Sequence, residues 1–241
     1  MRILFTGAHP DDFEYYCAGT FAKYYKQGGH EFYIAIGTNG NIGSFRIKDQ
    51  KELAETRRQE ALNSCAKIGA HLIWMNFNDE YLIDSEEVRN AYIDAFRVAR
   101  PDLVFTTYRF ADYNPDHEIN GYMTFIARIN ATIPLIKTEH EPTVKIPPMF
   151  YCAPTGGFWE FKPDYFVDIT NEMDMKREMW DCHKSQGAAD WSGDMFGCDP
   201  FQGMESLNGL MGFNIGVRYA EAFQLCKTWP IGSDAPHKLL P

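Results

Sequence analysis

The stretch Ala8-His9-Pro10-Asp11-Asp12-Phe13-Glu14 lies directly after the apolar run Ile3-Leu4-Phe5. One imidazole and three carboxylates therefore fall within six residues, just beyond a predicted buried strand. A turn between a strand and a helix does not need this density of ionisable side chains. The pattern predicts a strand that ends in a functional loop, and the rest of the chain indicates which fold contains it.

Strand and helix patterns alternate four times in the first half of the chain. Apolar runs are separated by segments with helical spacing, and glycine, proline or a capping serine marks their ends. The predicted strands are 1–6, 31–36, 72–75 and 103–106, and the predicted helices are 19–27, 49–69, 85–100 and one that follows the polar loop 108–117 and continues through 129. This alternation predicts an α/β fold with a mostly parallel sheet and right-handed crossover connections.

The second half of the chain has a less regular pattern. Further strands are predicted at 144–151 and 165–169, and further helices at 171–185 and 216–226. The intervening segment 186–214 is rich in glycine, methionine and aromatic residues and has little periodicity. A segment of this kind predicts an irregular lid or interface loop, and an ordered surface loop packed by its own aromatic side chains is the alternative.

Composition limits the class of protein. The chain has 241 residues and no Pro/Gly/Ser-rich linker, so we expect a single domain, 1–241. Its net charge of −10 and its lack of a Lys/Arg cluster argue against a nucleic-acid partner. Scattered cysteines, no signal segment and no apolar run near the roughly 18 residues of a membrane span predict a reduced, cytoplasmic protein without a membrane segment.

Polar side chains gather in the loops that follow the predicted parallel strands. The carboxyl ends of such strands meet at one edge of the sheet, where ligands bind. The loop residues are His9, Asp11 and Asp12 after the first strand, Asn39 and Asn41 after the second, Asp79 after the third, and Asp112, Asn114, Asp116 and His117 after the fourth. Residues 9 and 117 are therefore expected to meet in one crevice, although they are distant in sequence.

Two histidines and one aspartate of these loops fit a metal site that activates water. Such a site needs about three protein ligands and an open position, and His9, Asp12 and His117 can provide the ligands. Asp11 is then free to take a proton from water, and Asp116 can hold a ring nitrogen of a ligand histidine. The alternative for each loop alone is a helix N-terminus whose acidic side chains complement the helix dipole.

The remaining histidines are weaker candidates. His30 and His71 precede strands at the opposite edge, and His140 and His237 fall in a loop and in the tail. His183 ends a predicted helix, where a cation suits the helix dipole, but it could also reach a substrate in the crevice. We therefore keep His183 as a candidate for substrate contact.

The first loop and Pro115-Asp116-His117 resemble the two metal motifs of the LmbE-like, or PIG-L, family of zinc-dependent N-deacetylases. The similarity continues over most of the chain. It includes Arg57-Arg58-Gln59-Glu60-Ala61, Val167-Asp168-Ile169-Thr170, His183-Lys184-Ser185-Gln186 and Tyr219-Ala220-Glu221-Ala222-Phe223. The spacing of the two metal motifs makes the resemblance specific.

The resemblance implies a Rossmann-like, three-layer α/β sandwich. It also implies that Zn²⁺, or another divalent ion such as Fe²⁺, is bound. The implied metal ligands are His9, Asp12 and His117. Asp11 is the implied general base, and Arg57 and Asp79 match positions that contact the sugar. The implied reaction removes an N-acetyl group from an amino sugar such as N-acetylglucosamine, from a glycoconjugate or from a related N-acyl compound.

Two positions depart from the family pattern. Many members carry a histidine where this chain has Asn114, and an asparagine can donate a hydrogen bond to an oxyanion but cannot protonate a leaving amine. The proton would then come from Asp11, or from another group such as His183 or Asp112. Asn41 stands where many relatives have an acid, so we expect this residue to change the substrate contacts.

Other functions fit parts of the pattern. A non-catalytic or weakly active sugar-binding relative is the alternative that Asn114 favours. Two histidines and one carboxylate also describe iron(II) oxygenases, but the strand–helix alternation argues against their usual β-helix fold. A nucleotide-binding Rossmann protein is disfavoured, because no Gly-x-Gly-x-x-Gly follows the first strand. A homo-oligomer is compatible with the sequence, with segment 186–214 as its candidate interface.

Overall fold

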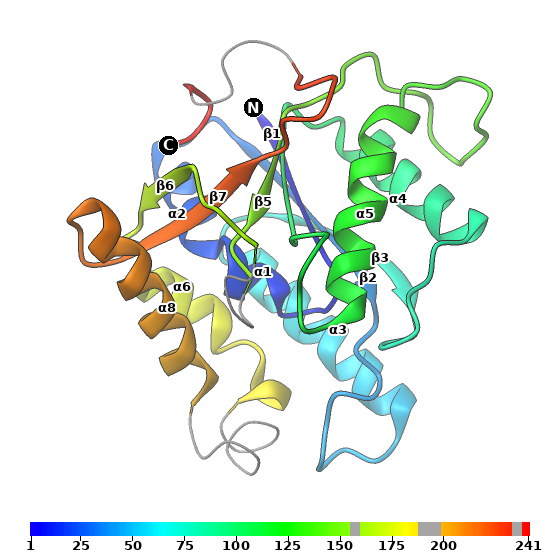
Figure 1. The fold of residues 1–241 in the computed structure, drawn as a ribbon. Helices are drawn as coiled ribbons and strands as arrows, with labels where there is room; N and C mark the ends of the chain where they lie inside the picture. The colour runs from blue at the N-terminus through cyan, green and yellow to red at the C-terminus, as the bar shows by residue number, and fades with distance from the viewer. Residues whose placement is uncertain (155–159, 188–198, 233–237) are drawn as a thin grey trace.

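The computed structural model describes residues 1–154, 160–187, 199–232 and 238–241. Within these residues, seven strands form one sheet in the order β3-β2-β1-β4-β5-β7-β6 (Figure 1). The strands are β1 (Arg2–Gly7), β2 (Glu31–Thr38), β3 (His71–Phe77), β4 (Leu103–Thr106), β5 (Met149–Cys152), β6 (Tyr165–Asp168) and β7 (Ala220–Leu225). Strands from both halves of the sequence therefore share one sheet.

The sheet is parallel except where β7 enters it. β1 lies between β2 and β4, β2 pairs with β3, and β4 pairs with β5, all in parallel. β7 runs antiparallel between β5 and β6. In the β1–β2 register Gly7 lies opposite Ile36, so the loops after both strands leave from the same edge. The predicted α/β fold with a mostly parallel sheet is confirmed.

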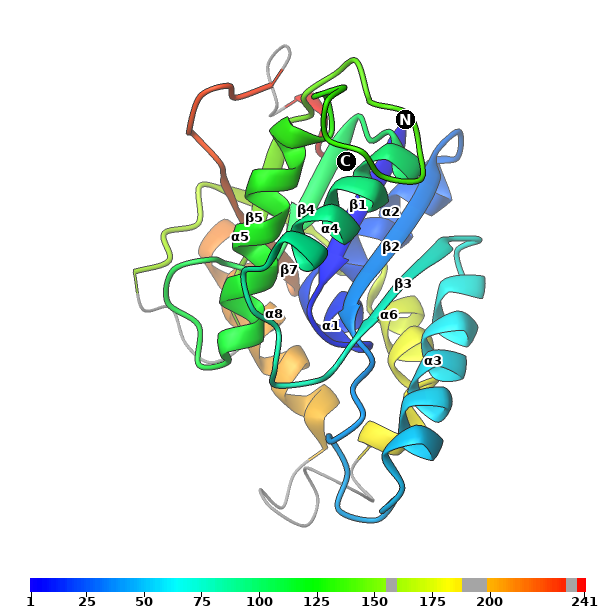
Figure 2. The same ribbon diagram turned by 90° about the vertical axis from the view of Figure 1, so that its right-hand side faces the viewer.

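Helices cover both faces of the sheet and give three layers (Figures 1 and 2). They are α1 (Asp12–Tyr16), α2 (Ala18–Gln27), α3 (Gln50–Ala66), α4 (Glu86–Ala99), α5 (Pro115–Asn130), α6 (Met173–Trp180), the 3₁₀ turn η1 (Lys184–Gln186) and α8 (Pro200–Ile215). α4 and α5 lie on the near face in Figure 2, whereas α2 and α6 pack into the hydrophobic cluster of the other face. Among the described residues, no helix is long and apolar enough to cross a membrane.

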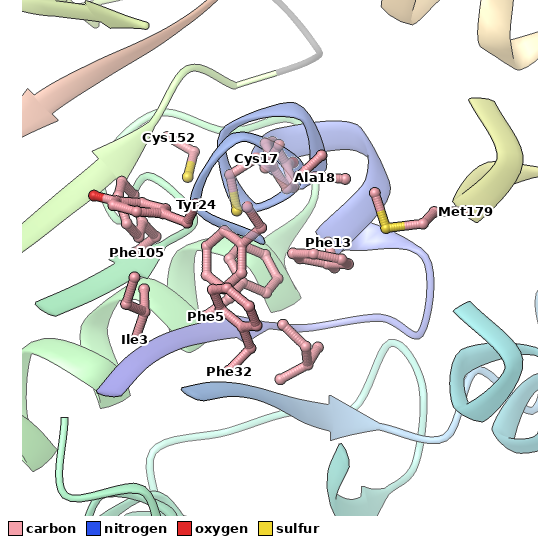
Figure 3. Packing of buried hydrophobic residues seen from close by; sticks show 14 of the residues in the cluster. Ile3, Phe5, Phe13, Cys17, Ala18, Tyr24, Phe32, Phe105, Cys152 and Met179 are labelled. Carbon is pink, nitrogen blue, oxygen red and sulfur yellow. The ribbon is translucent and has the colours of Figure 1, made fainter. Parts of the chain in front are cut away.

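The apolar part of the first loop anchors it to the core. Phe13 is buried, and its ring packs against Phe5 of β1 and Phe21 of α2 at centroid distances of 5.7 and 5.1 Å (Figure 3). Phe105 of β4 also contacts Phe21. Because full burial of a phenylalanine contributes about 1.5–3 kcal/mol, these rings hold the start of α1 against the strand that precedes it.

The predicted helix at 216–226 is wrong, because Ala220–Leu225 form β7. Alanine and glutamate favour a helix locally, but the backbone of this segment pairs with strands on both sides. Glu221 is buried, lies 2.7 Å from the Lys176 ammonium, and accepts hydrogen bonds from the backbone N–H groups of Gly19 and Thr20. These tertiary contacts outweigh the local preference.

The prediction of an irregular segment at 186–214 is wrong for its second half. Pro200–Ile215 form α8, where Asp199 accepts a hydrogen bond from the N–H of Phe201 and Gly216 ends the helix at φ +75°. Aspartate, proline and glycine at these places are helix start and stop signals, but the prediction gave more weight to composition. The stretch 188–198, which makes up most of the first half of this segment, lies outside the described residues.

Two other predicted elements are shorter than expected. The strand predicted at 144–151 begins only at Met149, after two consecutive prolines that cannot donate to a sheet. The helix predicted at 171–185 ends at Trp180, and the chain then turns into η1. This turn brings the segment after α6 back to the carboxyl edge of the sheet.

We expect Lys176→Met to lower the free energy of unfolding by about 3–5 kcal/mol, because Glu221 would remain buried without its cation. Urea denaturation followed by circular dichroism measures the change. Lys23→Met is the matched control, since Lys23 is only partly buried and donates to the carbonyl oxygen of Asp168 rather than to a carboxylate. Equal losses in the two variants would show that the buried ion pair does not hold β7 in the sheet.

Candidate metal centre and active site

The loops after β1, β3 and β4 meet at the carboxyl edge of the sheet, as the strand order requires. His9 and Asp12 come from the β1–α1 turn, Asp79 follows β3, and His117 lies in the first turn of α5. These side chains line one cleft of about 700 Å³. Residues more than a hundred positions apart in sequence therefore face the same space.

Three potential ligand atoms converge in this cleft. The Nδ1 atom of His9 lies 3.0 Å from Nε2 of His117, and the Oδ1 atom of Asp12 lies 3.6 and 3.3 Å from these two nitrogens. All three side chains are buried. Two imidazoles and one carboxylate at this spacing fit a divalent cation of the zinc type, which takes three protein ligands in catalytic sites.

Backbone amides fix the position of the Asp12 carboxylate. Its Oδ2 atom accepts hydrogen bonds from the N–H groups of Ala8 and His9 at 2.6 and 3.0 Å, which leaves Oδ1 facing the two imidazoles. Gly7 permits this close approach, because a Cβ atom there would lie 2.8 Å from Cβ of Asp12. The turn after β1 is therefore shaped around this one carboxylate.

The opposite nitrogen of each imidazole is held by a carboxylate. Nε2 of His9 lies 3.1 Å from Oδ1 of Asp79 and 3.6 Å from Oδ2 of Asp116, and Nδ1 of His117 lies 3.0 Å from Oδ1 of Asp112. These acceptors favour the proton on the outer nitrogens and leave the lone pairs of His9 Nδ1 and His117 Nε2 facing Asp12. The tautomers that a metal ligand requires are thus selected by the surrounding acids.

The electrostatics of the site favour positive charge. Burial alone would lower the pKa of His9, but hydrogen bonds to Asp116, Asp12 and Asp79 outweigh it and raise this pKa well above its usual value. Burial is likewise outweighed at His117, whose pKa rises to about 9 through Asp12 and Asp112. The two imidazoles in turn hold the pKa of the Asp12 carboxyl far below its usual value, against the effect of burial. The same carboxylates would stabilise the positive charge of a metal ion.

Asp11 and Arg57 form a pair beside the three converging atoms. Asp11 lines the cleft, and its Oδ1 atom accepts a hydrogen bond from Nη2 of the buried Arg57 at 2.7 Å. Although Asp11 is at the N-cap of α1, its side chain makes no capping hydrogen bond. Arg57 also donates to the carbonyl oxygen of Gly40 and lies 3.9 Å from Asp79. The carboxylate of Asp11 is therefore oriented by a fixed cation at the cleft.

Gly40 leaves the room that Arg57 needs. It has a φ of +65°, and a Cβ atom at this position would overlap the guanidinium group. A glycine is required here for both reasons, the backbone conformation and the close approach.

Asn114 has both ends of its amide engaged. Its Oδ1 atom caps α5 by accepting a hydrogen bond from the N–H of Asp116, and its Nδ2 atom donates to Oε1 of Glu80 at 2.8 Å. Asn114 lines the cleft. Asp116 lies behind His9, and its carboxylate accepts hydrogen bonds from the backbone N–H groups of Glu80 and Leu82. Asp116 thus holds both the loop after β3 and the imidazole of His9.

Asn41 and His183 are not among the residues that line the cleft. Oδ1 of Asn41 accepts the N–H of Asp79, so Asn41 supports the loop after β3. His183 is buried, and its Nε2 atom lies 3.1 Å from Oε2 of Glu14. Burial opposes protonation of His183, but the Glu14 charge outweighs it and raises the pKa. Glu14 also accepts a hydrogen bond from Ser64.

Several residues of the cleft were missed by the sequence reasoning. Four aromatic side chains line it from three places in the chain, and one more acid, Glu80, follows Asp79 directly. The aromatic residues are Tyr15, Tyr16, Tyr113 and Trp180. The hydroxyl of Tyr16 lies 3.1 Å from Nδ1 of His117, and the Tyr113 ring packs edge-on against the same imidazole. Tyr113 and Glu80 are neighbours of residues singled out earlier, which is the signal that could have found them.

Comparison with known proteins agrees with this geometry. Diacetylchitobiose deacetylase of Thermococcus kodakarensis is 29% identical over 189 residues, which cover 77% of this chain and 70% of that protein. The solved structure of N,N'-diacetylchitobiose deacetylase from Pyrococcus horikoshii superposes on this chain with a TM-score of 0.80 and 27% sequence identity. The superposition covers 92% of this chain and 82% of the deacetylase chain. A 4-oxalmesaconate hydratase of Pseudomonas putida is 26% identical over 76% of this chain and 73% of its own length.

The sequence pattern of the family described as "PIG-L: GlcNAc-PI de-N-acetylase" matches residues 4–127, just over half of the chain. The match includes the loop after β1 and the start of α5, which carry the three converging atoms. The resemblance predicted from the two motifs is confirmed. This chain belongs to the PIG-L, or LmbE-like, family.

Proposed function

We propose that this protein is a metal-dependent hydrolase that removes the N-acetyl group from an amino sugar. The convergence of His9 Nδ1, Asp12 Oδ1 and His117 Nε2 beside the oriented carboxylate of Asp11 carries the proposal. The diacetylchitobiose deacetylases among its relatives support the same reaction type.

His9, Asp12 and His117 would hold the ion, with Zn²⁺ or another divalent cation such as Fe²⁺ as the candidates. The ion would supply Lewis acidity, which makes water a better nucleophile and polarises the amide carbonyl. Asp79, Asp116 and Asp112 keep the two imidazoles in the required tautomers. The chain's own contribution to this step is therefore a fixed set of lone pairs.

Asp11 is the proposed proton carrier. Its carboxylate takes one proton from water as the water oxygen attacks the acyl carbon, and Arg57 holds it in place for that transfer. When the C–N bond breaks, the electron pair goes to nitrogen, and Asp11 returns the proton to the leaving amine. Asn114 holds no proton that it could give, so the same carboxylate serves both halves of the reaction.

The cleft suits a neutral sugar better than a carboxylate substrate. Aromatic side chains such as Tyr113 and Trp180 offer faces on which the apolar side of a sugar ring packs. Arg57 is the one lysine or arginine among the described lining residues, and it already pairs with Asp11. An N-acetylated sugar or glycoconjugate therefore fits the site.

A hydratase is the second candidate, because one relative is named as a hydratase of a carboxylate. Hydration of a double bond would use the same activated water and the same base. The lack of an unpaired lysine or arginine in the described lining disfavours it. A sugar-binding protein without activity is the third candidate, and Asn114 is the residue that motivates it.

Zinc-loaded protein should release free amine from at least one N-acetylated sugar, and Asp11→Asn should lower kcat by at least about 10²-fold while it retains the metal, since only the proton acceptor is lost.

Elemental analysis should show about one divalent ion per chain, lost in His117→Ala because one of three ligands is removed. Asp84→Asn, a surface acid paired with Arg89, is the control that should keep both properties.

Metal-free protein that stays active would contradict the metal-dependent mechanism. Equal inertness of the wild type and Asp11→Asn on every N-acetyl sugar would favour the sugar-binding alternative. Turnover of an unsaturated carboxylate without amine release would favour the hydratase.

Gly40→Ala should lower kcat by about tenfold or more and leave the metal content unchanged, because the new methyl group displaces Arg57 from Asp11. Gly69→Ala is the matched control: Gly69 has a φ of +64°, close to the +65° of Gly40, but open space where its Cβ would lie. Both variants carry the same backbone strain, so thermal melting of Gly69→Ala measures the strain alone, and any further loss of stability in Gly40→Ala reports the displacement of Arg57. Equal activities would rule out a role of Arg57 in orienting Asp11.

A further inference from the structure

Glu80 lies at the cleft in a backbone conformation that side chains other than glycine rarely adopt. Its φ is +65°, in the left-handed region. The carboxylate of Asp116 holds this conformation by accepting the Glu80 N–H at 2.8 Å and the Leu82 N–H at 3.1 Å. The backbone that carries Glu80 is therefore fixed by the same acid that lies behind His9.

The Glu80 side chain is held from the other side of the cleft. Nδ2 of Asn114 donates to Oε1 of Glu80 at 2.8 Å, while Oδ1 of Asn114 is occupied by the helix cap. The Asn114 amide cannot turn without losing one of these bonds. As a result the Glu80 carboxylate stays beside Asn114, and both residues line the cleft.

Glu80 is the acid of the cleft whose charge is least compensated. Asp11 pairs with Arg57, Asp79 lies near His9 and Arg57, and Asp12 faces two imidazoles. Glu80 has a neutral amide as its donor, and within the described ranges no lysine, arginine or histidine forms an ion pair with it. It adds negative charge and a free acceptor to the substrate space.

We propose that Glu80 is the specificity-determining residue of the site. It accepts hydrogen bonds from hydroxyl or ammonium groups of the sugar, and it rejects sugars that carry a phosphate or a carboxylate. Although Glu80 is exposed at the cleft, a bond from a donor to a carboxylate is stronger than one to a neutral acceptor, and like charges repel. This inference rests on the proposed function, because it names the class of N-acetyl sugar that the same site takes.

The test compares neutral, anionic and cationic sugars on zinc-loaded protein. The first readout is the ratio of kcat/KM for N-acetylglucosamine to that for its 6-phosphate and its 1-phosphate. The second is the affinity for glucosamine, measured by calorimetry with glucose as the neutral reference. Glu80→Gln keeps the size and the amide contact but loses the charge, and Glu87→Gln removes the same charge from an exposed position outside the lining of the cleft.

We expect the wild type to favour the neutral substrate by about tenfold or more, with a preference that shrinks as salt is added. Glu80→Gln should reduce that preference to about threefold or less and should weaken glucosamine binding, whereas Glu87→Gln should leave both unchanged. Asn114→Ser retains a helix-capping residue but releases Glu80, so it should lose part of the preference.

An unchanged ratio and an unchanged glucosamine affinity in Glu80→Gln would overturn the proposal, while amine release would still support the deacetylase. A uniform loss of kcat on all substrates would overturn it as well, since it would mean that Glu80 acts only as a structural brace. If no sugar is turned over, the deacetylase fails, and calorimetry still tests whether Glu80 separates cationic from neutral sugars.

Discussion

The Asp12 carboxylate, held by the amides of Ala8 and His9, is the constraint on which the site depends. One oxygen closes the turn after β1, and the other faces the two imidazoles. The same side chain closes the turn and presents the oxygen that would face a cation. The way in which β1 ends therefore determines where a cation would be bound. Gly7 leaves room for the Asp12 side chain, and the buried Phe13 packs the turn against the core.

The second constraint is the contact of each histidine with at least one acid. Asp79 and Asp116 act on His9, and Asp112 acts on His117. The contacts of His9 with Asp79 and Asp116 join the loops after β1, β3 and β4, whereas the contact between Asp112 and His117 stays within the connection from β4 to α5. These contacts orient both rings, and the low dielectric of their buried surroundings strengthens each contact.

The meeting of His9, Asp12 and His117 could be predicted from the sequence, because it follows from the topology of the sheet. Once the strands alternate with helices, the loops that carry His9 and His117 must open at one edge, and their residue types identify the chemistry. The sequence indicated Asp116 as a residue that can hold a ring nitrogen of a histidine, and its Oδ2 atom lies 3.6 Å from Nε2 of His9. The contacts of Asp79 with His9 and of Asp112 with His117 were not predicted, because they depend on side-chain geometry that the pattern does not show. β7 was missed for a related reason, because the burial of Glu221 in this strand depends on its contact with Lys176, which is 45 positions away in the sequence.

Asn114 joins two functions that are usually separate, since one end of its amide starts the helix that carries His117 and the other holds Glu80. A substitution that removes both ends of the amide therefore changes the start of α5 and the position of Glu80 together, whereas one that keeps a capping oxygen, such as serine, releases Glu80 alone. A change of the Glu80 side chain leaves the cap of α5 intact, so under the proposed function position 80 can vary, whereas its neighbour Asp79 is constrained by its contact with His9.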